Sequence, residues 1–365
     1  MGFSNPEGWA GPAVTDSLLL ASTDQGELSA LNAEDFSRLW TFPTGQEDPE
    51  LDLEAIYTTP LVSGDIVYFG AYSGEVFALN LEDGSEKWRF DTDDNIIAGL
   101  EALYIDELIE TLFVGTDEGS LYALDAETGQ PRSNFFDAGD SIWAAPLLSD
   151  GLLYVASVNG KLFALDAETF NPVWEEPFEA GQGLISDPVL ADGTILVGGI
   201  DRELHAVDAA SGEELWSFDA GNWFWGRPLV VDGTVYAPSL DDRLYALSLE
   251  TGDELWSFEA EEGIRSSPVL TDDTLVIVDR DGNVYGLDPM TGAALPWSPR
   301  VIDKTVLSNP LVLEEAVQEE VAEDVKEKVF ISAEGGDLFR LEDPTSGELS
   351  RLDPNTGRFV RVVTP

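Results

Sequence analysis

The stretch DPVLADGTILVGGIDRELHAVDAASGEELWSF, residues 187–218, decides the fold because it recurs with variation along the chain. The next copy, RPLVVDGTVYAPSLDDRLYALSLETGDELWSF, spans residues 227–258. Earlier copies are TPLVSGDIVYFGAYSGEVFALNLEDGSEKWRF at 59–90 and APLLSDGLLYVASVNGKLFALDAETFNPVW at 145–174. Further copies begin near residues 11, 99, 267 and 309. A degenerate repeat therefore covers nearly the whole chain.

The period of this repeat can be read from one alanine. It stands in the central x-A-L-x element at Ala30, Ala78, Ala123, Ala164, Ala206 and Ala246, with Gly286 and Arg340 in its place later. The intervals are 48, 45, 41, 42, 40, 40 and 54 residues. Units of 40 to 45 residues with four short strands each are typical of propeller blades. The sequence predicts an all-β protein, an eight-bladed β-propeller of four-stranded antiparallel blades, with residues 1–365 as one domain.

Proline and turn residues within each unit mark the ends of the strands. In residues 187–218, a Pro-led apolar run at 188–190 predicts the inner strand, and the turn Asp192-Gly193 separates it from a β-rich run at 194–197. A second polar turn leads to the x-A-L-x strand, and Ser211-Gly212 leads to the outer strand with Trp216. The apolar runs are too short for helices.

A tryptophan recurs in the outer strand of five units, at Trp40, Trp88, Trp174, Trp216 and Trp256. We expect each to pack between neighbouring blades, and its replacement by Ala to cost about 3–5 kcal/mol. The seventh unit shifts its tryptophan to Trp297, and the third and eighth units lack one. Those three seams are predicted to be weaker.

Three insertions interrupt the repeat, at residues 45–55, around 106–110 and at 314–328. The last is acidic, and Val317, Val321 and Val325 recur in it every four residues, as on one face of a helix. The sequence leaves a short helix and a mobile acidic flap equally open. Such a flap would suit a basic partner, whereas a plain loop extension needs no function.

Charge and composition exclude several classes of function. The chain has 71 acidic and 18 basic residues, a net charge of −53. It would repel nucleic acid and anionic membranes, which leaves a saline habitat, a basic partner or loose divalent-cation binding as explanations. No apolar run approaches the roughly 18 residues of a membrane-spanning helix. There is no cysteine, and the first 11 residues lack signal-peptide features.

The pattern L-x-A-L-D-A-x-T-G-x-x-x-W, seen at 121–129, 162–174 and 204–216, resembles the tryptophan-docking repeat of PQQ-like β-propellers. That family includes quinoprotein dehydrogenases and BamB-type outer-membrane assembly lipoproteins. The dehydrogenases are longer and use a Cys-Cys disulfide against the quinone, so the resemblance favours the non-catalytic BamB-type branch. It implies neither PQQ nor Ca²⁺ as a cofactor, and a periplasmic, cell-envelope or extracellular location. The lipid-attachment cysteine of that branch is absent.

Candidate catalytic and metal-binding residues are few. His205, the single histidine, occupies the slot filled by Phe77, Tyr122 and Tyr245 in other units, which indicates a packing role. Residues 279–283, DRDGN, resemble a calcium loop but coincide with a hairpin turn of the repeat. We therefore predict no catalytic residue, no bound cofactor and no metal ligand.

One set of positions stands out, three residues before each inner-strand proline. In a propeller these positions surround one mouth of the central channel. They are Trp9, Tyr57, Trp143, Ile185, Trp225, Arg265 and Leu307, with Trp223 beside Trp225. Aromatic side chains with an arginine favour protein binding, and the alternative is that the rings cover the gaps between inner strands.

We therefore predict a monomeric, non-catalytic scaffold that binds a protein or peptide, with a basic partner as one option, at this aromatic mouth. Two other hypotheses stay open. One is a PQQ-dependent alcohol or sugar dehydrogenase, and the other is the ligand-sensing domain of a signalling system.

Overall fold

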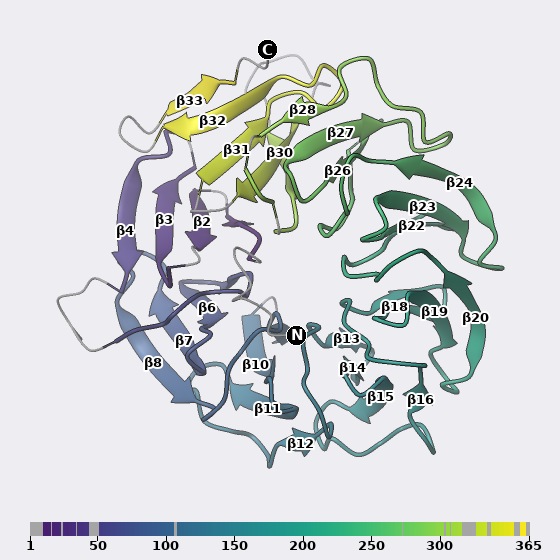
Figure 1. Cartoon of the computed structure of the whole chain (residues 1–365). Helices are drawn as coiled ribbons and strands as arrows, with labels where there is room; N and C mark the ends of the chain where they lie inside the picture. The colour runs from purple at the N-terminus through teal and green to yellow at the C-terminus, as the bar shows by residue number, and fades with distance from the viewer. Residues whose placement is uncertain are drawn as a thin grey trace.

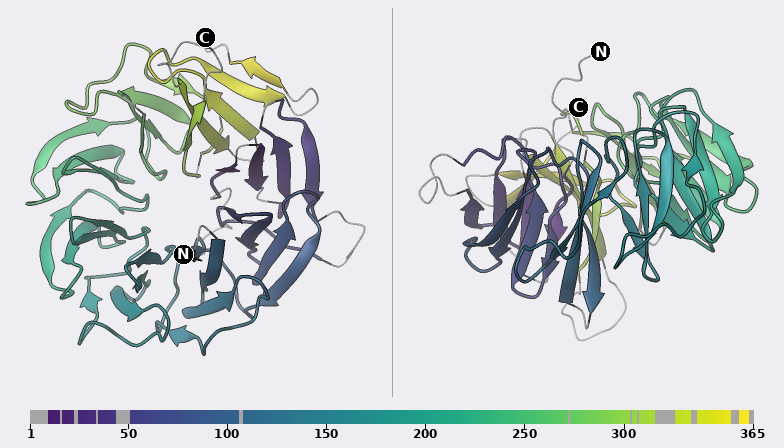
Figure 2. Two further views of the ribbon diagram at one scale, coloured as in Figure 1. Left: turned by 180° about the vertical axis from the view of Figure 1, so that it is seen from behind. Right: turned by 90° about the horizontal axis from the view of Figure 1, so that it is seen from below.

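Eight β-sheets stand around a common axis and form a closed ring, as Figure 1 shows. The computed structural model describes residues 10–15, 17–22, 25–33, 35–43, 51–105, 108–271, 273–302, 304–306, 308–315, 326–333, 337–353 and 358–362. Seen from below, the sheets are separate layers around the ring (Figure 2). The eight-bladed all-β propeller predicted from the repeat is confirmed.

The first four blades follow one another along the chain. Their strands are β1 (Ala13–Val14), β2 (Leu18–Ser22), β3 (Leu28–Asn32) and β4 (Arg38–Phe42); β5 (Leu61–Ser63), β6 (Ile66–Gly70), β7 (Glu75–Asn80) and β8 (Glu86–Asp91); β9 (Glu101–Ile105), β10 (Leu108–Gly115), β11 (Ser120–Asp125) and β12 (Phe136–Asp137); and β13 (Leu147–Ser149), β14 (Leu152–Ala156), β15 (Lys161–Asp166) and β16 (Phe178–Glu179).

The other four blades complete the ring. Their strands are β17 (Val189–Ala191), β18 (Thr194–Gly198), β19 (Glu203–Asp208) and β20 (Glu214–Asp219); β21 (Leu229–Val231), β22 (Thr234–Pro238), β23 (Arg243–Ser248) and β24 (Glu254–Glu259); β25 (Val269–Leu270), β26 (Leu275–Val278), β27 (Asn283–Leu287) and β28 (Arg300–Val301); and β29 (Leu311–Glu315), β30 (Lys326–Ala333), β31 (Asp337–Leu341), β32 (Leu349–Asp353) and β33 (Arg358–Arg361).

Each blade is an antiparallel meander whose strands pair in chain order. The turn between the first two strands explains why. In blade five, Asp192 and Gly193 have φ values of 47° and 79°, and two successive positive φ angles are those of the tight hairpin turns that match strand twist. Ala191 therefore pairs with Thr194, and the second strand returns directly along the first.

The tryptophans of the outer strands join one blade to the next. In the clearest case, the indole of Trp216 in blade five donates Nε1–H to the carbonyl of Leu249 in blade six at 2.9 Å. The same ring lies against Gly252, whose φ is 72°. Matching contacts join Trp40 to Gly84, Trp88 to Gly129, Trp174 to Gly212 and Trp256 to Gly292. The turn glycine leaves room for the ring of the preceding blade.

Phenylalanine fills the turn position at the two seams where the preceding blade lacks a tryptophan. Phe170 stands there in blade four and Phe36 in blade one, both buried and with φ near +56° (57° and 55°). Between ring centroids, Phe170 lies 6.2 Å from Phe113 of blade three, and Phe36 lies 4.7 Å from Phe359 of blade eight. Trp297 contacts Gly347 at the seam of blades seven and eight. That these three seams are less stable than the five with the regular tryptophan stays a prediction.

Blade eight departs from the four-stranded blade predicted from the repeat, because its sheet holds five strands, β29 to β33. The insertion at 314–328 was expected as a helix or a flap. That expectation is wrong at its ends, where Glu314 pairs with Glu327 and Glu315 with Lys326 as a longer hairpin. Both ends of the insertion are strand: β29 runs on to residue 315 and β30 begins at residue 326, so the two strands stay paired into the insertion. Residues 316–325, with the three valines, lie outside the described residues.

No strand pairing joins blades one and eight in the described part of the chain. Each sheet takes its strands from one continuous segment, so no sheet combines the two ends of the chain. Leu19, Leu31 and Phe36 of blade one pack with Phe330 and Leu338 of blade eight. The seam is an apolar core of the same kind as the other seven.

Candidate functional site

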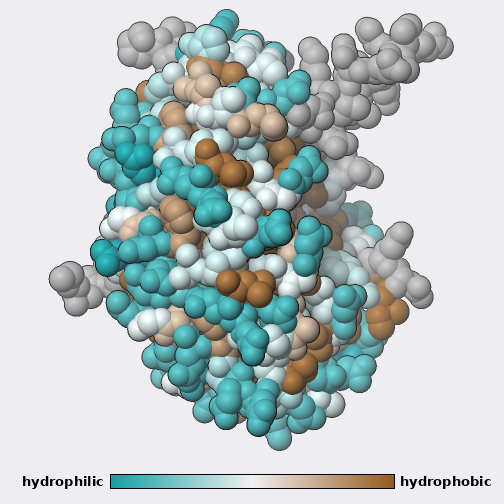
Figure 3. Space-filling view, turned by 90° about the vertical axis from the view of Figure 1, so that its right-hand side faces the viewer, coloured by the Kyte–Doolittle hydropathy of each residue, from teal (hydrophilic) through white to brown (hydrophobic). Residues whose placement is uncertain are grey.

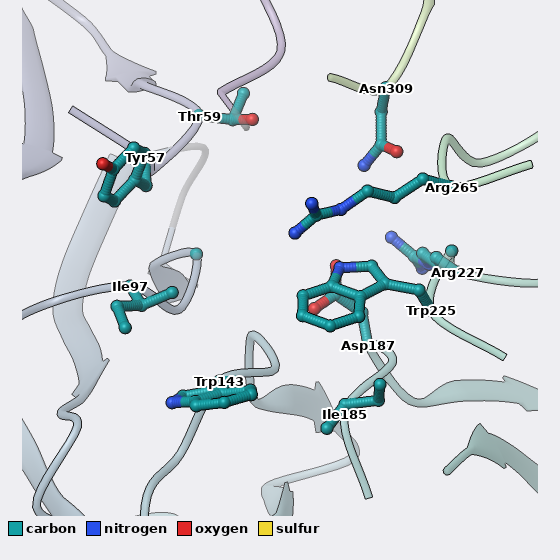
Figure 4. A pocket seen from close by; sticks show the side chains of 12 residues that line it. Tyr57, Thr59, Ile97, Trp143, Ile185, Asp187, Trp225, Arg227, Arg265 and Asn309 are labelled. Atoms are coloured by element: carbon teal, nitrogen blue, oxygen red, sulfur yellow. The ribbon is translucent and has the colours of Figure 1, made fainter. Parts of the chain in front are cut away.

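A pocket opens where the segments entering the inner strands converge, as Figure 4 shows. It has a volume of about 600 Å³, part of which is open solvent. Blades two to eight all contribute to it. The lining residues are Tyr57, Thr59, Ile97, Gly99, Trp143, Ile185, Asp187, Trp225, Gly226, Arg227, Arg265 and Asn309. We call this surface the channel mouth.

Buried hydroxyl groups hold these entry segments in place. Thr58, which follows Tyr57, donates its hydroxyl to the carbonyl of Gly70 at 3.0 Å and accepts the N–H of Gly70 at 2.9 Å. Ser266, which follows Arg265, donates to the carbonyl of Val278 at 2.8 Å. Because each hydroxyl is fixed to the second strand of its own blade, the preceding side chain is directed toward the channel mouth.

A second set of hydrogen bonds runs between blades, from the residue directly before four of the inner-strand prolines. Gly11 donates its N–H to Thr59 at 3.1 Å, and Ala145 donates to Asp187 at 2.7 Å. Two further bonds follow the same rule, from Arg227 to Ser267 at 3.1 Å and from Ser267 to Asn309 at 2.8 Å. The backbone of one blade is therefore tied to a side chain of the next, which fixes the spacing of the mouth.

Two indole rings line the aromatic side of the channel mouth, and a third, that of Trp223, stacks with one of them. Trp225 lies 6.1 Å from Trp143 and 6.4 Å from Trp223, measured between ring centroids. Trp143 donates its Nε1–H to the carboxylate of Asp117 at 2.6 Å. Trp143 and Trp225 come from blades four and six, two blades apart, so their approach depends on the closed ring.

Charged groups stand beside the rings. The Arg265 guanidinium lies over the ring of Trp225, 4.0 Å from its centroid, a cation–π geometry. Burial, with a smaller effect of nearby Arg280, lowers the pKa of Arg265 to about 9. Burial raises the pKa of Asp187, although the Ala145 N–H and the charge of Arg227 oppose this. The lining thus offers two arginines and one carboxylate in a chain that is strongly acidic.

The structure brings together most of the residues singled out from the sequence. Tyr57, Trp143, Ile185, Trp225 and Arg265 all line the channel mouth. Trp223 does not line it but stacks behind Trp225. Trp9 and Leu307 lie outside the described residues.

The sequence did not predict Ile97 at the channel mouth, because blade three has Leu100 where the other blades have the inner-strand proline. It also missed Thr59, Asp187, Arg227 and Asn309. The signal for these four was present, as polar residues directly before the prolines.

Two other candidates from the sequence lie elsewhere. The carboxylate of Asp279 is buried and accepts hydrogen bonds from the backbone and side chain of Asn283 and from the Tyr285 hydroxyl. These bonds belong to its hairpin turn. His205 is buried in its aromatic slot, 5.3 Å from the ring of Phe178 in the preceding blade. Neither residue lines the channel mouth.

Comparisons with known proteins place the chain in a family. Two overlapping matches to a model described as "Outer membrane protein assembly factor BamB" cover residues 108–188 and 171–338, more than half of the chain. The chain belongs to the PQQ-like β-propeller family. A second model of this family, the β-propeller domain of glucose, ethanol and alcohol dehydrogenases, matches residues 23–141. No curated protein sequence matches the chain.

Solved structures share the PQQ-like propeller fold at low sequence identity. BamB from Moraxella catarrhalis has a TM-score of 0.70 at 18% identity, covering 90% of this chain and 92% of its own. The computationally designed Ika8 protein has a TM-score of 0.72 at 15% identity, with 91% and 95% covered. Quinohemoprotein alcohol dehydrogenase from Comamonas testosteroni has a TM-score of 0.69 at 14% identity, with 91% and 71% covered. At these identities the likeness shows the fold alone.

Proposed function

We propose that this PQQ-like propeller is a non-catalytic scaffold that binds a segment of a partner protein at the channel mouth. The observation that carries the proposal is the convergence of Trp143 and Trp225, from two blades, with Arg265 over one ring. Tryptophan and arginine are the residues most enriched among the few that dominate binding energy at protein interfaces. Here they line a concave surface fixed by hydrogen bonds between blades.

Support also comes from the rest of the surface. The outer rim carries exposed apolar side chains, such as Leu215 on β20 and Leu255 on β24. Figure 3 shows hydrophobic residues on this rim as separate spots among hydrophilic ones. Scattered single residues of this kind are normal on soluble proteins and do not indicate an interface. The channel mouth therefore supports binding better than the rim.

A calcium–quinone centre does not fit the channel mouth. Calcium takes six to eight oxygen ligands, mostly from carboxylates and carbonyls. Among the described lining residues, Asp187 is the one carboxylate, and it already accepts the Ala145 N–H. This donor set favours the scaffold over a PQQ-dependent dehydrogenase. The cell envelope is the location we propose, because the larger family match is described as an outer-membrane assembly factor. No helix able to cross a bilayer occurs in the part of the chain that the structure describes.

Exchange of both tryptophans tests the proposal. The native partner is captured, identified, purified and titrated with the wild type and with Trp143→Ser/Trp225→Ser. Loss of two such anchors is expected to weaken binding by about 2–4 kcal/mol, roughly 30- to 1000-fold. The matched control, Leu215→Ser/Leu255→Ser, removes two exposed apolar side chains from the rim and should leave the affinity unchanged.

The outcome separates the hypotheses. A folded double variant with full affinity removes the channel mouth as the binding site. Binding that fails only at high salt indicates the acidic insertions instead, since salt screens exposed charges more than about 8 Å apart at physiological ionic strength and at shorter range in concentrated salt. Tight binding of added PQQ and Ca²⁺, with oxidation of an alcohol or sugar, would replace the scaffold with an enzyme.

A further inference from the structure

The one histidine of the chain is surrounded by carboxylates on the third strand of blade five. His205 Nε2 lies 3.0 Å from Asp201 Oδ2, and Nδ1 lies 2.8 Å from Glu214 Oε1 and 3.9 Å from Glu203 Oε2. The imidazole and Asp201 side chains are 4% and 8% exposed, whereas Glu203 and Glu214 are 38% and 42% exposed. We call these four residues the His205 cluster.

Neighbouring blades show which of these contacts belongs to the repeat. In blade six, Tyr245 fills the slot of His205 and donates its hydroxyl to Asp241 at 2.7 Å. Asp241 stands at the position of Asp201, 40 residues later. The bond from Nε2 to Asp201 therefore replaces the tyrosine–aspartate bond of the repeat. The contact of Nδ1 with Glu203 and Glu214 has no counterpart in blade six, where Arg243 replaces Glu203.

The geometry of the His205 cluster has a recognised chemical use. Metal-binding histidines almost always donate their second ring N–H to a carboxylate, which fixes the tautomer and directs the other nitrogen to the metal. With Nε2–H donated to Asp201, the lone pair of Nδ1 faces the two glutamates. The ligand atoms of Glu203, His205 and Glu214 all lie within 4.8 Å of one another.

Three carboxylates around the imidazole favour a positive charge at the centre of the His205 cluster. Their oxygens lie 3.0 Å (Asp201), 3.9 Å (Glu203) and 2.8 Å (Glu214) from the imidazole nitrogens. A divalent cation bound to Nδ1 would supply that charge and would engage both glutamates.

We propose that Glu203, His205 and Glu214 bind one divalent transition-metal ion, with Asp201 as the residue that positions the imidazole. One imidazole nitrogen with two carboxylates suits Zn²⁺ or Mn²⁺ better than Ca²⁺ or Mg²⁺, which prefer oxygen alone. Three protein ligands leave a position for water. The two exposed glutamates give the ion a path from solvent, and the net charge of −53 raises the local concentration of cations.

Only small movements are needed to form the site. Zinc binds nitrogen and oxygen at about 2.0–2.2 Å, so ligand atoms around a tetrahedral ion lie about 3.4 Å apart. Glu214 must move slightly away from Nδ1, now 2.8 Å distant, and Glu203 must approach from 3.9 Å. Both are half-exposed side chains at the first residues of β20 and β19, where rotamer changes disturb no core packing.

Titration of the untagged protein with Zn²⁺ tests the proposal. Concentrated KCl and excess Mg²⁺ suppress weak binding to the acidic surface, and calorimetry then counts the remaining sites. The wild type should bind one Zn²⁺ per chain. His205→Tyr, which installs the residue of blade six, should abolish this site, and Asp201→Asn should weaken it by about 10- to 100-fold. The matched control Glu254→Gln alters the blade-six residue equivalent to Glu214 and should change nothing.

Nuclear magnetic resonance of the wild type gives a reading that does not depend on the folding of any variant. His205 is the single histidine, so a ¹⁵N-histidine sample gives one imidazole spin system. Saturating Zn²⁺ should shift its Nδ1 resonance strongly and leave Nε2 protonated. An imidazole spectrum that Zn²⁺ does not change would overturn the proposal. Equal stoichiometric binding by folded His205→Tyr would overturn it too.

Discussion

The seam between blades three and four allows an exchange of side chains that tests how blades are joined. At six of the eight seams a tryptophan lies on the turn glycine of the next blade. Here blade three has Ser133 at the tryptophan position and blade four has Phe170 at the glycine position. Phe170 is 7% exposed and has a φ of 57°. Phe170→Gly and Ser133→Trp, made singly and together, would convert this seam to the common type.

The expected magnitudes follow from burial and backbone conformation. Removal of a buried phenylalanine ring costs about 3–5 kcal/mol, and relief of a left-handed backbone at a non-glycine residue returns about 1–2 kcal/mol. Phe170→Gly should therefore lower the free energy of unfolding by about 1–4 kcal/mol. Ser133→Trp alone should gain nothing, because Phe170 occupies the space. In the double variant the indole packs on the new glycine, with a favourable coupling of about 1–3 kcal/mol.

Urea denaturation at constant KCl, followed by far-ultraviolet circular dichroism, measures the four free energies of this cycle. The control is Phe135→Ala. Phe135 is an exposed phenylalanine of blade three, and its replacement should change stability by less than about 0.5 kcal/mol. A coupling near zero would refute the idea that phenylalanine and the tryptophan–glycine pair are alternative ways to fill one seam. So would full stability of Phe170→Gly.

Two further predictions concern the turn glycines and one ion pair. A Cβ added at Gly252 would lie 2.6 Å from the indole of blade five, whereas one at Gly233 has nothing within 4 Å, although their φ values of 72° and 75° are alike. Urea unfolding should therefore show Gly252→Ala less stable than Gly233→Ala by about 1–3 kcal/mol, and equal losses would contradict the docking role. Asp337 lies 2.7 Å from Lys304 and 2.6 Å from Arg351. Burial raises its pKa, but these two partners outweigh burial and hold the pKa below its usual value. Its contribution is thus present above the unfolded pKa of about 3.9 and lost as the pH falls through the folded value. The stability gap between wild type and Asp337→Asn should close on acidification, and a gap that widens would contradict this assignment.

The repeat made most of the fold predictable. The recurring x-A-L-x position, alanine in six of the eight units, and the turn residues sufficed to place eight blades, because period and turn chemistry are local properties of the chain. The fifth strand of blade eight, β33, was not foreseen, because the repeat predicts four strands in each unit. The extension of β29 and β30 into the insertion was not foreseen either, since the valines at every fourth residue left a helix and a flap equally open. The role of Phe36 and Phe170 in filling two seams was not predicted. Their meaning depends on a tryptophan missing from a different blade, which a unit read on its own does not show.

The channel mouth was partly predictable for the same reason. Positions three residues before the inner-strand prolines converge because the blades are equivalent, so Trp143 and Trp225 could be placed at one mouth of the channel from sequence. The approach of their rings to 6.1 Å was not predicted. Ile97 was not predicted, because blade three lacks the inner-strand proline that marks this position in the other blades. The partners of His205 could not be found from the repeat, because the contact with Glu214 crosses a β-bulge between β19 and β20.

The contiguity of each blade has a consequence for how such a protein can change. In the described chain every sheet is encoded by one uninterrupted segment, and blades one and eight share an apolar core but no paired strands. Duplication or deletion of one segment of the gene would add or remove a whole sheet without breaking any backbone ladder. Transient separation at the joint of blades one and eight would likewise leave an arc of intact sheets, free to close again.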